Sequence, residues 1–206
     1  MIMTDMDFVK LGKRVLQEEA AALVNASTLI EKSNFHDATS TILRSSGHVI
    51  VIGIGKSGHI GRKISASLSS TGTPSFFVHP SEAKHGDLGS IRREDVVILI
   101  SYSGTSEEVV SLMPHIKNKG AITIALTGNT ESLLARSADL VISTKIEKEA
   151  CPYNLAPTVS TCVVLGIGDA LSMALMQARR FSTESFLENH PAGEIGKTLS
   201  LKRPLI

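Results

Sequence analysis

The amino-acid sequence predicts an α/β fold, a three-layer sandwich in which a five-stranded parallel sheet carries helices on both faces. Two observations support this prediction. Short apolar runs alternate with longer helical patterns from residue 48 to residue 180, and this alternation is typical of parallel sheets covered by helices. Two of the apolar runs also end in loops rich in glycine or serine, as expected at the carboxyl edge of such a sheet, where ligands bind.

Two helices are predicted ahead of the first strand. Residues 5–33 form one long helical pattern, because apolar residues recur every three or four positions, at Phe8, Leu11, Val15, Ala22, Ala26 and Leu29. A second helix is expected over residues 35–45. These helices make up an N-terminal part, residues 1–46, of a single domain whose α/β core and C-terminal helices occupy residues 47–206.

Strands and helices alternate after residue 47. Strands are predicted at residues 48–52, 75–78, 95–101, 121–126 and 139–143. Helices are predicted at 59–70, in the segment that ends near 118, and at 130–137, 157–180 and 182–189, with a further helical turn within 79–90. Pro114 should bend the helix that contains it or end it early, and Pro157 suits the first turn of the long apolar helix.

The composition is that of a globular protein, and its charge pattern gives no indication that the protein binds nucleic acid. Of the 206 residues, 42% are hydrophobic, and 21 basic residues balance 20 acidic ones to a net charge of +1 without a basic block. The first residues lack the basic and apolar regions of a signal peptide. Polar residues and glycines interrupt the apolar stretch 159–176, which predicts a buried helix and no membrane partner. Cys151 and Cys162 form no metal-type pair, which favours reduced thiols in a cytoplasmic protein.

The segment 96–108 combines an apolar run with a group of hydroxyls. The run ends at Ile100, and Ser101, Ser103 and Ser106 follow before helix-forming residues begin. Free N–H groups at a helix start and clustered hydroxyls favour an anion such as phosphate. Since the loop lacks the lysine of a nucleotide-binding P-loop, a phosphorylated small molecule is expected rather than ATP. The same hydroxyls would also cap a helix and close a turn, and the two roles are compatible.

The segment 53–58 is a second loop at a predicted strand end. Gly53, Gly55 and Gly58 have the spacing of a dinucleotide-binding fingerprint, but no acidic residue ends the next strand to hold a ribose. The glycines instead allow the backbone to approach a ligand closely. Lys56 lies on this tight loop, where lysine is rarely needed for packing, although a solvated surface lysine is the simple alternative.

Several segments in collinear order together resemble one known family. They are 53–61 (GIGKSGHIG), 72–80 (GTPSFFVHP), 82–89 (EAKHGDLG), the serine loop, 148–152 (KEACP), 155–158 (LAPT) and 190–196 (HPAGEIG). As a set they resemble the sugar isomerase (SIS) domain, and within it the D-arabinose 5-phosphate isomerases. The resemblance implies flavodoxin-like strand order. It also implies an enzyme that interconverts D-ribulose 5-phosphate and D-arabinose 5-phosphate through a cis-enediol, as a step towards 3-deoxy-D-manno-octulosonate for lipopolysaccharide or capsule.

The resemblance also assigns roles to single residues. It makes Glu149 the first choice for the base that moves a proton between C1 and C2, whereas the residues alone favour a solvated surface loop. Partial burial beside Cys151 and Pro152 should raise the pKa of Glu149. Lys56 would stabilise an enediolate oxygen. Contacts with the substrate or its phosphate are implied for Gly55, Ser57, His85, Ser101, Ser103 and Ser106.

Two further residues carry competing interpretations. Thr105 to Glu108 has the spacing of a capping box, while the resemblance puts Glu108 in the active site, where it could move a proton or hold a hydroxyl. A lone histidine such as His190 is usually structural or exposed. In the resembling enzymes it enters the site, expected here from a neighbouring subunit, and assists opening of the furanose ring. Since members of the resembling family form tetramers, and the long apolar-faced helix 5–33 needs a surface to cover it, the resemblance implies a homotetramer with sites shared between subunits.

No cofactor and no catalytic metal are expected. His79, Glu82, His85 and Asp87 could bind a transition metal, but their irregular spacing favours a role in lining the site. Family members commonly carry a CBS pair after the SIS domain, and this chain stops at Ile206 without one, either naturally or because it was cut. Tyr102 and Thr105 also stand where the family often has Asn and Glu, which bears on substrate preference.

Two alternatives remain for the function. One is a SIS isomerase for a heptose or hexulose phosphate, against which the segment 148–152 argues. The other is a non-catalytic sensor of a sugar phosphate, against which the presence of Lys56, Glu108, Glu149 and His190 argues. A nucleotide sugar made later in the pathway is a candidate feedback ligand of the SIS domain itself.

Overall fold

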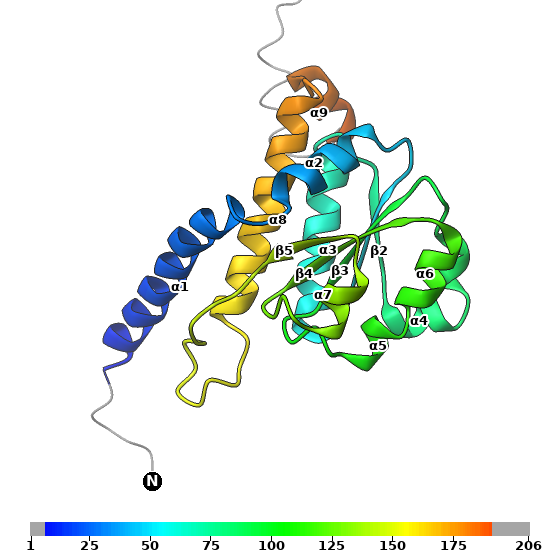
Figure 1. The fold of residues 1–206 in the computed structure, drawn as a ribbon. Coiled ribbons are helices and arrows are strands. Elements are labelled where there is room, and N and C mark those ends of the chain that lie inside the picture. Colours follow the sequence, from blue (N-terminus) through cyan, green and yellow to red (C-terminus); the bar gives the residue numbers. More distant parts are fainter. Residues whose placement is uncertain (1–6, 191–206) are drawn as a thin grey trace, which may run out of the picture.

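The computed structural model describes residues 7–190 of the chain. At its centre is a five-stranded, all-parallel sheet in the order β2-β1-β3-β4-β5 (Figure 1). The strands are β1 (Val49–Gly53), β2 (Ser75–Val78), β3 (Val96–Ile100), β4 (Ile122–Thr127) and β5 (Leu140–Ser143). The predicted fold class, the five strands and the flavodoxin-like order are confirmed.

Helices cover both faces of the sheet. One face carries α1 (Phe8–Ile30), α2 (Phe35–Arg44), α3 (Gly55–Ser70) and α8 (Val159–Ala178). The other carries α4 (Pro80–Lys84), the 3₁₀ turn η1 (Asp87–Ser90), α5 (Glu107–Val110), α6 (Met113–Lys119) and α7 (Leu133–Ser137). The last described helix, α9 (Thr183–Asn189), follows α8.

The strands bury their side chains on both faces, which divides the core in two. Successive side chains of a strand point to opposite faces. In β3, Val96, Ile98 and Ile100 therefore join the core under α3 and α8, whereas Val97 and Leu99 join the core under α5 and α6. This two-sided burial explains why the strands read as continuous apolar runs.

The long apolar helix α8 lies at the centre of the core that α3 and α8 cover. By length and composition it is the one helix among residues 7–190 that could cross a membrane, but half of it is buried in the fold. It packs against α3, α1 and α2, as expected for a core helix.

The two cysteines, Cys151 and Cys162, are free thiols.

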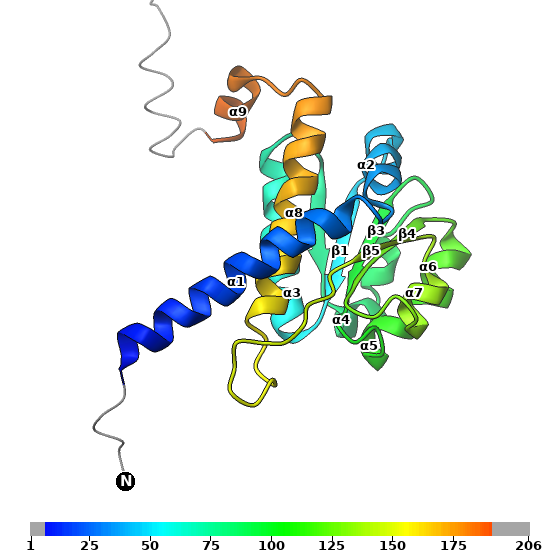
Figure 2. The same ribbon diagram turned by 60° about the vertical axis from the view of Figure 1, so that its left-hand side comes forward.

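The first helix extends away from the sheet (Figures 1 and 2). Only its C-terminal part lies beside α8, and Ala26 is its one buried residue. Phe8, Val9 and Leu16 are 74%, 82% and 68% exposed. Of the apolar face predicted from the sequence, Phe8 and Leu11 are thus exposed within one chain, whereas the later members are partly or fully buried, namely Val15, Ala22, Ala26 and Leu29.

Three local predictions change in detail. The helix expected from residue 59 begins at Gly55, so Lys56 lies in the first turn of α3 and not on a loop. The segment around Pro114 forms two helices, and this proline lies in the first turn of the second, as its missing N–H allows. Pro157 precedes the N-cap residue Thr158 of α8, so the prediction that it lies inside the first turn is wrong.

Candidate active site

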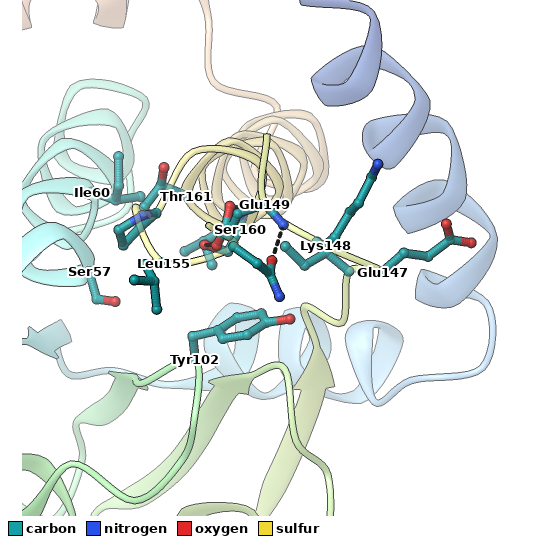
Figure 3. A pocket seen from close by; sticks show the side chains of 13 residues that line it. Ser57, Ile60, Tyr102, Glu147, Lys148, Glu149, Leu155, Ser160 and Thr161 are labelled. Carbon is teal, nitrogen blue, oxygen red and sulfur yellow. Dashed lines mark hydrogen bonds between the residues drawn. The ribbon is translucent and has the colours of Figure 1, made fainter. Parts of the chain in front are cut away.

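A cavity of about 230 Å³ lies at the carboxyl edge of the sheet. Its walls come from four segments: the first turns of α3, the loop after β3, the loop after β5 and the start of α8 (Figure 3). The lining residues are Ser57, Ile60, Tyr102, Ile146, Glu147, Lys148, Glu149, Asn154, Leu155, Pro157, Ser160, Thr161 and Val164. Because β2 and β3 lie on opposite sides of β1, the connections reverse direction between β1 and β3, where ligands bind in such sheets.

The carboxylate of Glu149 caps the N-terminus of α8 from inside this cavity. Its Oε2 accepts hydrogen bonds from the Thr158 N–H at 2.9 Å, the Thr158 hydroxyl at 3.1 Å and the Ser160 N–H at 3.1 Å. Its Oε1 accepts one from the Ser160 hydroxyl. The Glu149 N–H donates to Asn154 Oδ1 at 2.7 Å. The loop that carries Glu149 is thus tied to the start of α8 and is not freely solvated.

These bonds reverse the pKa shift predicted for Glu149. Burial raises the pKa of its carboxyl, but the donors on Ser160 and Thr158 stabilise the charged form more, so the pKa lies below its ordinary value of 4.5. The prediction of a raised pKa is therefore wrong, because it considered burial and not the hydrogen-bond donors of α8. At neutral pH the Glu149 carboxyl is therefore ionised, and the hydrogen bonds from α8 fix its orientation.

The serine loop follows β3 and is closed by its own hydroxyls. Ser101 is 3% exposed, and its Oγ lies 3.0 Å from Ser106 Oγ and accepts from the Gly104 N–H at 3.2 Å. Ser103 Oγ accepts from both the N–H and the hydroxyl of Thr105, at 3.3 and 3.0 Å. The carbonyl of Tyr102 accepts from the Gly128 N–H at 2.9 Å, which fixes the loop to the end of β4.

The helix after this loop is shorter than predicted. The four-residue helix α5 has Ser106 as its N-cap residue, with no capping bond from the side chain. The capping box considered between Thr105 and Glu108 is therefore not formed, because α5 begins one residue too late for Thr105 to be its N-cap residue. A helix of one turn contributes little dipole, so any anion held here depends on hydroxyls and backbone N–H groups. Glu108 is exposed in the first turn of α5.

Lys56 and Ser57 lie in the first turn of the 16-residue helix α3. Ser57 lines the cavity. Lys56 is exposed, and a cation at the positive end of a helix is electrostatically unfavourable, so this lysine is not placed there for stability. Gly58 permits close packing, since a Cβ there would lie 2.7 Å from the Gly53 carbonyl oxygen. Gly55 adopts a φ of +58° at the helix start.

His190 and His85 do not line the cavity that contains Glu149. His190 is the C-cap residue of α9, stacked on Phe186, with Nδ1 2.8 Å from the Phe186 carbonyl oxygen. Its neighbour Asn189 contacts Ser70 at the far end of α3, so the length of α8, about 30 Å for 20 residues, separates His190 from Glu149. His85 is exposed at the C-cap of α4. Residues 191–196 of the quoted motif lie outside the described residues.

Across residues 7–190, no three His, Cys, Asp or Glu side chains gather to hold a metal ion. His79, one of the four side chains considered for a metal, accepts a hydrogen bond on Nδ1 from the Ser81 N–H and caps α4. This capping role accounts for its position next to Pro80.

Four further residues shape the cavity: sequence analysis assigned no role to three of them, and noted Tyr102 only as a departure from the family. Thr158, Ser160 and Asn154 hold Glu149, and Tyr102 places its ring beneath Glu149 and Ser160, with Ser57 to one side (Figure 3). The signal for Ser160 was a hydroxyl in the first turn of an otherwise apolar helix. No periodicity connects it with a glutamate eleven residues earlier.

The fold and the position of the cavity define a class, the doubly wound α/β proteins that bind ligands at the switch point of a parallel sheet. Within that class, the family described as SIS domain matches residues 42–187 of this chain. The chain belongs to the SIS domain family.

The chain is also similar to individual proteins. The arabinose 5-phosphate isomerases KdsD of Pseudomonas aeruginosa and of Escherichia coli K12 are 48% and 49% identical to it, over 96% and 95% of its length. The chain spans 60% of the length of each of these relatives. A solved structure of an Escherichia coli CFT073 protein in complex with arabinose 5-phosphate has a TM-score of 0.81 and 39% identity, and covers 90% of this chain and 100% of that one.

Proposed function

We propose that this chain is an aldose–ketose isomerase that interconverts D-ribulose 5-phosphate and D-arabinose 5-phosphate through a cis-enediol. The observation that carries the proposal is the ionised Glu149 carboxylate in the switch-point cavity, which Ser57 and Tyr102 also line. The similarity to arabinose 5-phosphate isomerases supports the substrate. So does the structural neighbour solved in complex with arabinose 5-phosphate, which this chain matches over that neighbour's full length.

In the proposed reaction, one group of residues binds the phosphate end of the substrate and another acts on C1 and C2. Ser101, Ser103 and Ser106 bind the phosphate with Ser57, and this non-reacting end positions C1 and C2. Gly55 and His85 complete the substrate contacts. Glu149 removes a proton from one carbon and returns it to the next, while Lys56 and Glu108 hold the carbonyl and hydroxyl oxygens and His190 assists ring opening.

The reaction is redox-neutral, since a hydrogen moves within one molecule, so it requires no redox cofactor. We infer that residues 1–206 are the SIS domain of a cytoplasmic enzyme that supplies 3-deoxy-D-manno-octulosonate synthesis. A homotetramer would bring His190 of one subunit to the cavity of another, and the exposed apolar side chains of α1, Phe8, Val9 and Leu16, support such an association. A nucleotide sugar from the same pathway is the proposed feedback ligand.

The decisive experiment is incubation of the pure protein with D-ribulose 5-phosphate in D₂O, followed by NMR. We expect D-arabinose 5-phosphate, with deuterium at C2 to the extent that the proton on Glu149 exchanges with solvent, and much slower formation of this product by the Glu149→Gln protein. Conversion of a heptose or hexulose phosphate instead would define another SIS isomerase. Calorimetric binding of sugar phosphates without turnover of any of them would define a sensor.

A further inference from the structure

The two oxygens of the Glu149 carboxylate have unequal surroundings. Oε2 accepts three hydrogen bonds, from the N–H and hydroxyl of Thr158 and from the N–H of Ser160. Oε1 accepts a single bond, from the Ser160 hydroxyl. A carboxylate oxygen has about two lone-pair sites, so Oε2 is saturated and Oε1 retains one free site.

Capping of α8 alone does not require the two hydroxyls. The N–H groups of Thr158 and Ser160 already place the carboxylate at the helix N-terminus, and the dipole of a 20-residue helix adds to its stabilisation. The two hydroxyls make a separate contribution, because they fix the rotation of the carboxylate group about its bond to the side chain. The Thr158 hydroxyl is itself held by the Ala150 N–H at 3.0 Å, and Ser160 is 3% exposed, so neither hydroxyl is free to turn away.

We propose that Ser160 and Thr158 are positioning residues for the isomerisation, and that they leave Oε1 of Glu149 as the oxygen that takes and returns the substrate proton. The proposal rests on the proposed function. In the first half of the step, a C–H bond breaks and its proton moves to Oε1, its electron pair forms the C=C bond, and the π pair of the carbonyl group moves onto the carbonyl oxygen. The hydroxyl proton of the neighbouring carbon then moves to that oxygen. In the second half, the oxygen that lost this proton forms the new C=O bond, and the electron pair of the C=C bond takes the proton from Oε1 at the other carbon.

The first test is Ser160→Ala, with Ser172→Ala as its matched control. Ser172 is a buried serine of the same helix, and its hydroxyl donates to the Gly168 carbonyl at 2.8 Å, away from the cavity. We expect Ser160→Ala to lower kcat at least about tenfold, since a hydrogen bond to a charged group is lost, with KM nearly unchanged. We expect Ser172→Ala to keep the kcat of the unsubstituted protein.

The second test measures the acid limb of kcat, together with a titration of the Glu149 carboxyl by ¹³C NMR, its signal assigned by its loss in Glu149→Gln. Because the Ser160 hydroxyl stabilises the charged form, both midpoints should move to higher pH in Ser160→Ala and stay in place in Ser172→Ala. A merely structural hydrogen bond would move the NMR midpoint of Glu149 and leave the acid limb of kcat in place.

Thr158 provides an independent pair of variants. Thr158→Val is close in shape but removes the donor to Oε2, and Thr158→Ser retains it. We expect kcat to fall in the valine variant and to be largely restored in the serine variant. If Ser160→Ala does not fold, this pair decides the question.

The outcomes separate the two proposals. If the unsubstituted protein does not form D-arabinose 5-phosphate, the proposed function is wrong. If it does, and Ser160→Ala and Thr158→Val retain its kcat and its midpoints, the positioning role is wrong while the function stands.

Discussion

Gly53 and Ile100 are in-register partners at the carboxyl ends of β1 and β3. The first turn of α3 leaves the sheet from one of these positions, and the serine loop leaves from the other. Two segments separated by more than forty residues in the sequence therefore begin side by side. This pairing places Ser57 and Tyr102 on the walls of one cavity, which Glu149 also lines. The predictions below concern Glu149, the serine loop, the first turn of α3 and His190.

Glu149→Gln should lower turnover by roughly 10²–10⁴-fold, because an amide cannot accept the substrate proton. Binding of the sugar phosphate should be nearly unchanged, since the serine loop remains. Stopped assays of kcat and calorimetry of the same protein check both parts. Near-normal turnover would remove Glu149 from the role of base.

Ser103→Ala should raise KM for the sugar phosphate by about tenfold or more, given about 1.5–3 kcal/mol for a hydrogen bond to a charged group. Its effect on kcat should be smaller. Ser90→Ala is the matched control, because Ser90 is also exposed and its hydroxyl donates locally, to the Asp87 carbonyl at 2.7 Å. Equal KM values in the two variants would argue against a phosphate contact by Ser103.

Lys56→Met should separate activity from stability. The variant loses the cation proposed to stabilise the enediolate, so kcat should fall. Its thermal midpoint should stay the same or rise slightly, because a positive charge leaves the N-terminus of α3. A large loss of stability, or unchanged kcat, would show that Lys56 is a structural residue.

Gly104→Ala should destabilise the protein by about 2 kcal/mol or more, since a left-handed backbone alone costs roughly 1–2 kcal/mol for a residue with a Cβ. Gly104 has a φ of +66°, and a Cβ there would lie 2.0 Å from Ser132 Oγ. Urea unfolding measures the change. Gly12→Ala, in α1 with open space around it, is the control and should be neutral or slightly stabilising.

Mixing two inactive proteins should restore activity if sites are shared. Within one chain His190 lies at the opposite end of α8 from Glu149, so a Glu149→Gln subunit can supply the histidine to a His190→Asn subunit. Exchange of subunits, after dissociation in mild urea and dilution, should regain part of the activity of the unsubstituted protein. Activity of the isolated His190→Asn protein at the normal level would contradict the shared site.

Much of the fold could be predicted because its signals are local. Apolar runs, helical periodicity and the prolines and glycines that interrupt them depend on neighbours within a few residues. They predicted five strands in order and a break at Pro114. They also predicted that the serine loop and the segment 53–58 would share an edge of the sheet. The start of α3 was missed by four residues because glycines at 55 and 58 resemble a loop in sequence, whereas the close packing of Gly58 on the end of β1 is a tertiary contact.

Residue patterns were enough for the fold class, the family and the types of side chain available for proton transfer and phosphate binding. The state of Glu149 required the folded chain, because its pKa depends on donors from α8 that no local pattern associates with it. So did the remoteness of His190 from Glu149 within one chain, since the rigid length of α8 lies between them. The pKa of Glu149 and its separation from His190 both depend on groups that are far apart in the sequence, so neighbouring residues in the chain do not reveal them.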